Sequence, residues 1–278
     1  MATDTELLDL IATGLLPLGM SVSCGLPGVA AVVQKGGLEI GGRVFADPTA
    51  AMQAVLPGEC AMGSGWLFWH LPDAGRLSVR PLEHLRVALA ARSQQGQLKT
   101  SLTHPLRLDW LPIPGYAGRL GMTLCPGKQG EGLYGGCWAR DLRQDLSALK
   151  EQWVAMVLTL LERHEFDLLG VPGFGAAVTA AGLEWQWREI RDSGTPDADF
   201  EAQWPALKER LRAVLASGAH VAVHCRGGLG RTGLVVARFL TQEGYAPDEA
   251  IRLVRVARPG TIETWAQEQY VRSWALNC

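Results

Sequence analysis

Short apolar runs alternate with amphipathic segments from about residue 103 to the end of the chain. Apolar runs and a strictly alternating segment predict strands at 106–113, 120–124, 153–161, 183–190 and 221–223. Apolar positions at helical spacing predict helices at 141–150, 162–170, 174–181, 200–215, 232–243, 247–257 and 261–275. Strands that alternate with helices predict an α/β fold, with a central, mostly parallel sheet flanked by helices.

The first hundred residues follow another pattern, which predicts a small α+β domain. Helices are predicted at 6–13, before Gly14, and at 48–55, where Asp47-Pro48 supplies an N-cap and a first-turn proline. Strands are predicted at 30–33, 38–45 and 64–70, with a hairpin turn at 35–37 and a closing helix through Leu82, Leu85 and Leu89. We therefore divide the chain into an accessory domain (1–95), a polar linker (96–102) and a second domain (103–278).

The stretch from Val221 to Gly233 carries the clearest chemistry. A buried strand runs into Cys225, three glycines follow within six residues, and a helix is predicted after Arg231. A glycine loop between a strand and a helix N-terminus binds anions through its free amides and the helix dipole. A cysteine in that position is stabilised as a thiolate nucleophile, and Arg231 can hold two phosphoryl oxygens. The alternative is a structural glycine turn around a buried cysteine, which the spacing and context disfavour.

The sequence His224-Cys225-x5-Arg231-Thr232 resembles the phosphate-binding loop of Cys-dependent protein tyrosine and dual-specificity phosphatases. Residues 125–128, 190–197 and 258–260 resemble the branch of kinase-associated phosphatases, so the resemblance spans about 105–275. It implies hydrolysis of phosphomonoesters, on phosphotyrosine and on phosphoserine or phosphothreonine of proteins, through a cysteinyl-phosphate intermediate. No cofactor and no metal site are expected.

Each loop residue then has an expected role. Cys225 attacks the phosphoryl group, and Thr232 donates a hydrogen bond to its sulfur in the second step. His224 is expected to support the loop rather than to titrate in turnover. Arg226, which follows the cysteine, could also strengthen attraction for anionic substrates. The amides that bind phosphoryl oxygens beside the Arg231 guanidinium belong to Arg226, Gly227, Gly228, Leu229 and Gly230.

Two further catalytic residues are candidates outside the loop. A general acid must protonate the leaving oxygen, and Asp192, just past a predicted strand, is preferred over Asp197, which also suits a helix N-cap. The segment 261–270 resembles the family segment that ends in a catalytic glutamine, which corresponds to Gln267. An ordinary glutamine on a helix surface is the alternative.

The first domain resembles the restriction enzyme adenine methylase-associated (RAMA) domain. The matching segments are 9–16, 42–51 and 65–69. The resemblance implies an accessory module for recognising modified DNA. Residues 1–99 contain eight acidic and seven basic side chains, so charge does not support DNA binding, and Trp66 and Trp69 are expected to be core residues.

Composition fits a globular protein in a reducing compartment. The formal net charge is −2, and 47% of residues are hydrophobic. Six widely spaced cysteines do not form a disulfide scaffold or a zinc motif, and no apolar run is long enough for a membrane span, so we expect a cytoplasmic protein without a membrane partner. The expected partner is a phosphorylated protein or a small phosphate ester, and lipid or RNA phosphates are alternative substrates. The sequence does not decide whether Cys125 or Cys137 can form a disulfide with an oxidised Cys225.

Overall fold

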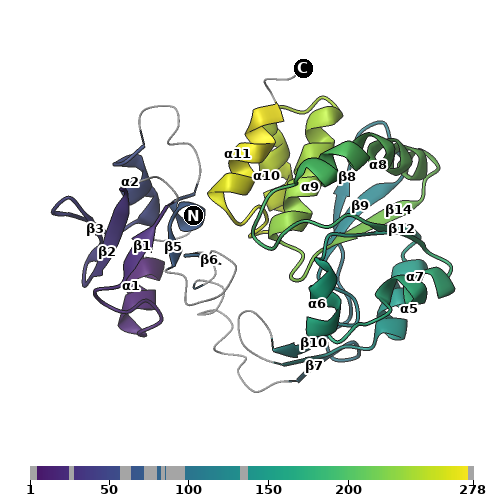
Figure 1. The fold of residues 1–278 in the computed structure, drawn as a ribbon, viewed down its shortest axis with the longest axis horizontal. Coiled ribbons are helices and arrows are strands. Elements are labelled where there is room, and N and C mark those ends of the chain that lie inside the picture. Colours follow the sequence, from purple (N-terminus) through teal and green to yellow (C-terminus); the bar gives the residue numbers. More distant parts are fainter. Residues whose placement is uncertain are drawn as a thin grey trace. The chain divides into compact units, whose positions relative to one another are not determined.

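The computed structural model describes residues 5–24, 28–56, 64–71, 80–82, 85, 98–131 and 137–274. The described residues up to 85 form one compact unit, and those from 98 onward form a second (Figure 1). None of the described helices combines the length and the apolar character needed to span a membrane.

The first unit contains a six-stranded antiparallel sheet in the order β4-β3-β2-β1-β5-β6. Burial alternates along β2, where Ala31 and Val33 are buried and their neighbours are exposed, as expected for a sheet with one covered face. The predicted helix before Gly14 and the helix capped by Asp47 are confirmed. The elements are α1 (Thr5–Ala12), β1 (Ser21–Ser23), β2 (Ala30–Gln34), β3 (Gly37–Ile40), β4 (Arg43–Phe45), α2 (Pro48–Gln53), α3 (Gly65–Phe68), β5 (His70–Leu71) and β6 (Arg80–Pro81).

Two strand predictions for this unit are wrong. The segment 38–45 forms two strands, because Gly41 and Gly42 have φ of 58° and 80° and turn the chain back into a hairpin. The predicted strand at 64–70 begins with the helical turn α3. A Cβ on Gly65 would lie 2.1 Å from the backbone of Pro48, so the glycine allows the two helices to pack closely. Most of the predicted closing helix, and residues 96 and 97 of the predicted linker, lie outside the described residues.

The second unit contains a five-stranded sheet in the order β13-β12-β14-β9-β8. All pairings are parallel except that of the edge strand β8, which confirms the predicted mostly parallel sheet. The elements are β7 (Leu98–Thr100), β8 (Asp109–Pro112), β9 (Arg119–Thr123), β10 (Gln129–Glu131), β11 (Cys137–Ala139), α5 (Leu142–Glu151), β12 (Val154–Thr159), α6 (Arg163–Leu168), α7 (Phe174–Ala180), β13 (Glu184–Trp187), α8 (Ala198–Ala216), β14 (His220–His224), α9 (Gly230–Gln242), α10 (Pro247–Ala257) and α11 (Trp265–Ser273).

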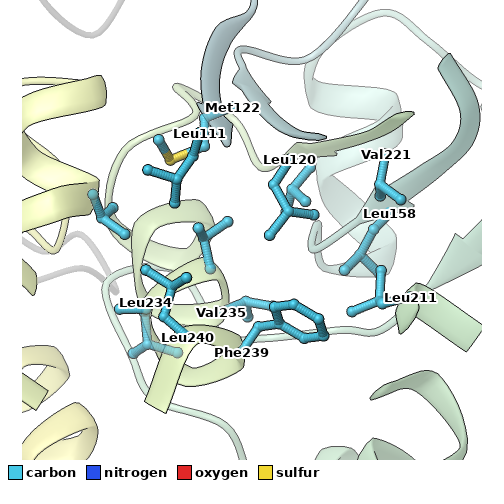
Figure 2. Packing of buried hydrophobic residues seen from close by; sticks show 14 of the residues in the cluster. Leu111, Leu120, Met122, Leu158, Leu211, Val221, Leu234, Val235, Phe239 and Leu240 are labelled. Atoms are coloured by element: carbon cyan, nitrogen blue, oxygen red, sulfur yellow. The ribbon is translucent and has the colours of Figure 1, made fainter. Parts of the chain in front are cut away.

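Helices cover both faces of this sheet. Alternate residues of β14 divide between two cores: Val221 and Val223 pack toward α8, α9, α10 and α11, and Ala222 packs toward α5 and α7. Figure 2 shows the larger core, where Phe239 and Leu240 of α9 lie among residues of the strands. Because β14 is the middle strand, the loop after His224 lies at the centre of the carboxyl edge, where such sheets bind ligands.

The sequence did not predict a second, small sheet in this unit. Its strand order is β10-β11-β7, and β7 pairs in parallel with β11. Residues 98–100, which fall within the predicted linker, are therefore part of the second unit. Short strands of three residues carry too little apolar periodicity to be recognised without their partners.

Candidate active site

The strand, loop and helix predicted around Cys225 are all present. β14 ends at His224, the chain bends through residues 226–229, and α9 begins at Gly230. Cys225 has a free thiol and is only 3% exposed. The N-terminal end of α9 presents backbone amides and the positive end of the helix dipole to the loop, a setting that stabilises anions.

Two features hold the loop in shape. At Gly228 φ is +73°, and a Cβ there would lie 2.1 Å from the carbonyl oxygen of Thr123, so only glycine fits. The Arg258 guanidinium donates to the carbonyl oxygens of Gly227 (3.0 Å) and Gly228 (2.6 Å) and pairs with Asp109 at 2.6 Å. The guanidinium thus binds two carbonyl oxygens of the loop that would otherwise repel a bound phosphate.

Arg231 is 2% exposed and is held by a carboxylate of α6. Glu165 accepts hydrogen bonds from Nη1 at 2.5 Å and from Nη2 at 2.9 Å, which makes a bidentate pair. The carbonyl oxygens of Leu160 and Ile190 accept two more bonds from Nη1, at 3.3 and 3.2 Å. Burial opposes the positive charge, but the hydrogen bonds to Glu165 outweigh it and raise the pKa of Arg231, so the guanidinium stays protonated.

Asp192 lies next to this guanidinium, and Asp197 caps a helix. The Oδ1 atom of Asp192 is 3.0 Å from Nη2 of Arg231, and the Asp192 side chain is 34% exposed. The Glu162 carboxylate accepts the backbone N–H of Asp192 at 3.0 Å and so fixes its loop. The exposed Asp197 accepts the N–H of Phe200 at 2.9 Å as the N-cap of α8.

Gln267 is fully buried, which excludes the alternative of an ordinary surface glutamine. Its Oε1 accepts the backbone N–H groups of Glu263 (3.0 Å) and Thr264 (3.3 Å), and its Nε2 donates to the carbonyl of Gly194 at 3.0 Å. Gly194 belongs to the loop of Asp192, so Gln267 connects the start of α11 to that loop. A Cβ on Gly230 would lie 3.0 Å from both atoms of the side-chain amide, so Gln267 also borders the phosphate loop.

A carboxylate from the segment before α11 also contacts the loop. Oε2 of Glu263 accepts the N–H of Gly230 at 2.7 Å. The preceding residue, Ile262, is buried and has φ of 58°, which is a rare conformation for a β-branched side chain. Arg255 donates to the Ile262 carbonyl at 3.1 Å and holds this turn. Because of the turn, α11 begins only at Trp265, later than the sequence predicts.

His224 is buried and neutral. Burial lowers its pKa to about 4. Trp185 donates to Oγ1 of Thr159 at 3.0 Å, which leaves the Thr159 hydroxyl hydrogen for Nε2 of His224 at 2.8 Å. Nδ1 of His224 then carries the proton and donates to the carbonyl of Cys225 at 3.2 Å.

The Thr232 side chain is fully buried in the first turn of α9. Its hydroxyl makes no hydrogen bond within the part of the chain that the structure describes. The predicted bond from Thr232 to the Cys225 sulfur is therefore not formed in this structure.

Within the part of the chain that the structure describes, two cations near Cys225 have no counter-ion. Lys128 is 3% exposed, and its ammonium lies 5.6 Å from the ring centre of Trp138. Arg226 is half-buried, and its Nε is enclosed without a hydrogen-bond partner. Neither cationic group forms an ion pair among the described residues. Burial, and next the charge of Arg226, lower the pKa of Lys128 to about 8.

The sequence assigned no role to Glu165, Arg258 or Glu263. A signal existed for Glu165, because α6 follows directly on β12 and its first turn must lie at the carboxyl edge of the sheet. Arg258 and Glu263 reach the loop from the far end of α10 and from the turn before α11. No group of three or more His, Cys, Asp or Glu side chains within the described ranges could hold a metal ion.

Comparisons with known proteins agree with this geometry. Residues 130–245 match the family described as "Polymorphic toxin system, DSP-PTPase phosphatase". Cyclin-dependent kinase inhibitor 3 of Rattus norvegicus is 28% identical over 175 residues, which cover 61% of this chain and 79% of the relative; the Homo sapiens protein is 27% identical with the same coverage.

A solved structure also shares the fold. Kinase associated phosphatase (KAP), with a serine in place of its catalytic-site cysteine, is 26% identical and covers 62% of this chain and 96% of its own, with a TM-score of 0.55. In fold, loop and sequence the chain is thus similar to the dual-specificity and protein tyrosine phosphatases, and the similarity supports a Cys-dependent phosphatase activity.

Proposed function

We propose that Cys225 is the nucleophile and Arg231 the phosphoryl-binding cation of this phosphatase. The observation that carries the proposal is the placement of both residues on one loop between β14 and α9, with the guanidinium fixed by Glu165. The Cys225 sulfur attacks phosphorus, the P–O ester bond breaks, and the phosphoryl group passes to sulfur. The loop amides and Arg231 stabilise the equatorial oxygens in the transition state.

Asp192 is the proposed general acid. Its carboxyl lies beside Arg231, so a phosphoryl group bound to that guanidinium replaces the contact and leaves Asp192 next to the leaving oxygen. Protonated Asp192 gives its proton to that oxygen. Water then attacks the phosphocysteine, Asp192 takes the proton from the water, and the S–P bond breaks. Gln267 orients the water, and the Thr232 hydroxyl, once rotated toward Cys225, stabilises the departing thiolate.

Substitutions at three positions test these roles on an aryl phosphate such as p-nitrophenyl phosphate. Cys225→Ser should abolish phosphate release; equal activity in both proteins would refute the nucleophile. Asp192→Asn should lower kcat by roughly a hundredfold or more and flatten the basic limb of the pH profile. Asp197→Asn is the matched control, since it removes the other candidate carboxyl and only weakens the N-cap of α8.

Phosphorylated proteins are the proposed substrates. The relatives named above are described as a cyclin-dependent kinase inhibitor and a kinase associated phosphatase, which supports a phosphorylated protein as substrate. A panel of phosphopeptides tests the assignment, with release of inorganic phosphate as the readout. The thiolate nucleophile also favours a reducing, cytoplasmic location.

The first unit is proposed to be a RAMA-like accessory module that targets the enzyme. DNA is a possible target by that resemblance alone, because the charge of residues 1–99 does not favour it. A gel-shift assay on the full chain at about 50 mM salt, where electrostatic binding is strong, is the test. Absence of a shifted band on methylated and unmethylated fragments would remove DNA as the target.

A further inference from the structure

We propose that Lys128 and Arg226 form a second anion subsite beside the phosphate loop, which takes a second phosphate on the same small molecule as the ester that is cleaved. The proposal rests on phosphatase activity at Cys225 and extends its substrates beyond phosphoproteins.

Three other cations around the loop have acidic partners. Arg231 binds both oxygens of Glu165, Arg258 pairs with Asp109, and Arg140, which is fully buried, pairs with Asp145 through two bonds of 2.8 Å. In the same neighbourhood, the ammonium of Lys128 and the guanidinium of Arg226 have none among the described residues. The contrast distinguishes these two groups from the three paired cations.

The backbone that carries Lys128 is firmly held. Gly127 donates to Asp145 at 2.8 Å, and the Lys128 N–H donates to the Cys125 carbonyl at 3.3 Å. Cys125 in turn donates a longer bond, 3.5 Å, to the carbonyl of Arg226. Lys128 and Arg226 are therefore carried by neighbouring backbone segments. Both oxygens of Asp145 already bind Arg140, so this nearby carboxylate is not available to neutralise Lys128.

An enclosed cation without a partner is unfavourable, because burial removes its hydration. The lowered pKa of Lys128 has this cause, with the positive charge of Arg226 as the next contribution. Perturbed groups of this kind are typical of sites that a ligand completes. An anion bound between the two cations would supply the missing counter-charge.

The depth of Lys128 restricts the ligand. With the side chain 3% exposed, only a compact anion attached a few bonds from the scissile ester can reach the ammonium. Neighbouring side chains of an extended peptide point to opposite sides, so a second phosphorylated residue fits this requirement poorly. Vicinal phosphates on one polyol ring meet it. Soluble inositol phosphates and the headgroups of inositol lipids share that chemistry.

The experiment compares substrates with one and with two phosphates on the full chain. The pairs are inositol 4-phosphate against inositol 4,5-bisphosphate, the corresponding short-chain phosphatidylinositol lipids, and a singly against a doubly phosphorylated peptide. The readouts are kcat and KM for phosphate release, and calorimetric binding to the Cys225→Ser protein. We expect kcat/KM for the bisphosphate to exceed that for the monophosphate by at least about tenfold, mainly through KM.

Four variants test the subsite, and one of them is a matched control on the surface. Lys128→Met and Arg226→Met should each reduce the bisphosphate preference severalfold, and Arg226→Lys should restore part of it. Arg210→Met removes a cation paired with Glu184 on the surface and should leave the preference unchanged. The soluble and lipid arms show which source of the headgroup is preferred.

Several outcomes would overturn the subsite. They are an equal kcat/KM for mono- and bisphosphates in the wild type, an unaltered ratio in both methionine variants, or a preference confined to the doubly phosphorylated peptide. An equal loss of kcat/KM for mono- and bisphosphates in the methionine variants would show that the two cations bind the scissile phosphate instead. Failure of the wild type to hydrolyse any aryl phosphate would refute the catalytic roles proposed above, whereas bisphosphate binding to Cys225→Ser tests the subsite independently.

Discussion

Arg231 and Lys128 are both almost completely buried close to Cys225, yet their surroundings are opposite. Arg231 is 2% exposed and has two carboxylate oxygens of Glu165 and two backbone carbonyls as acceptors. Lys128 is 3% exposed and has the face of Trp138. The pKa of Arg231 is raised and that of Lys128 is lowered to about 8. Burial is the same in the two cases, so the partner decides the sign.

The difference assigns the two cations to different tasks. A charge held by a buried carboxylate is permanent and correctly oriented before substrate arrives, which suits a group that stabilises the transition state. A charge without a partner makes the empty site less stable and gains from an anionic ligand. The contrast can be tested by removing the acidic partner of Arg231, or by removing the charge of Lys128.

Glu165→Gln removes the partner and should have the largest effect. The substitution keeps the size of the side chain but removes the buried counter-charge of Arg231, which then has only the partly exposed Asp192 as an acidic partner. Breaking a buried pair typically costs about 3–5 kcal/mol. The free energy of unfolding, measured in urea, should fall by about that amount, and kcat should fall with it. Glu184→Gln is the control, because its exposed pair with Arg210 contributes little. Similar losses in the two variants would contradict the contrast.

Lys128→Met removes the unpaired charge and should stabilise the protein. At pH 7 we expect a gain of up to about 3 kcal/mol, the upper bound set by the fall of the Lys128 pKa from 10.5 to about 8. Between these two pKa values the unfolded chain binds more protons than the folded one, so wild-type stability rises with pH while the variant lacks this rise. The advantage of the variant should therefore shrink as pH increases from 8. Urea unfolding at several pH values measures it; a less stable variant at pH 7 would refute the unpaired cation.

The order of elements in the second unit was predictable from sequence because each strand and helix carries its own periodicity. The carboxyl edge of the sheet followed from that order, and with it the position of the loop after β14. The strand predicted at 64–70 failed because a contact across the first unit, between Gly65 and Pro48, overrides the local preference. Three-residue strands such as β7 have no local signal and form only where partners are present.

The residues of the site also divide into those that the sequence predicts and those that it does not. Cys225, Arg231 and the loop glycines were predictable, since one contiguous segment carries them. Asp192 was preferred over Asp197 from sequence, and the structure adds a contact to Arg231. Glu165 and the unpaired state of Lys128 depend on which side chains from distant segments meet. The spacing of residues along the chain does not predict such contacts between distant segments.

Arg258→Met tests a paired cation that acts on the loop itself. The variant leaves the carbonyls of Gly227 and Gly228 without their donor, and we expect a loss of about 2 kcal/mol, typical of hydrogen bonds to a charged group. KM for a monophosphate should rise because the loop loses its fixed shape. Arg258→Lys is the matched variant, which keeps the charge without the bidentate geometry and should recover part of the stability. An unchanged KM in both would show that the loop holds its shape without Arg258.

Substitution of His224 should have the smallest effect, and there burial favours the neutral form of the ring. Its pKa is lowered to about 4 by burial, from an ordinary value of 6.5. Between these pH values the His224 ring binds a proton in the unfolded chain but not in the folded one. Stability that is present above pH 6.5 is therefore lost as pH falls toward 4. From pH 7 to about pH 5.5 the wild type should lose about 1 kcal/mol more than His224→Gln, which has no titrating ring. His220→Gln, at the other end of β14, should keep the wild-type dependence, and an equal acid sensitivity in His224→Gln would show that the charge of this ring does not oppose folding.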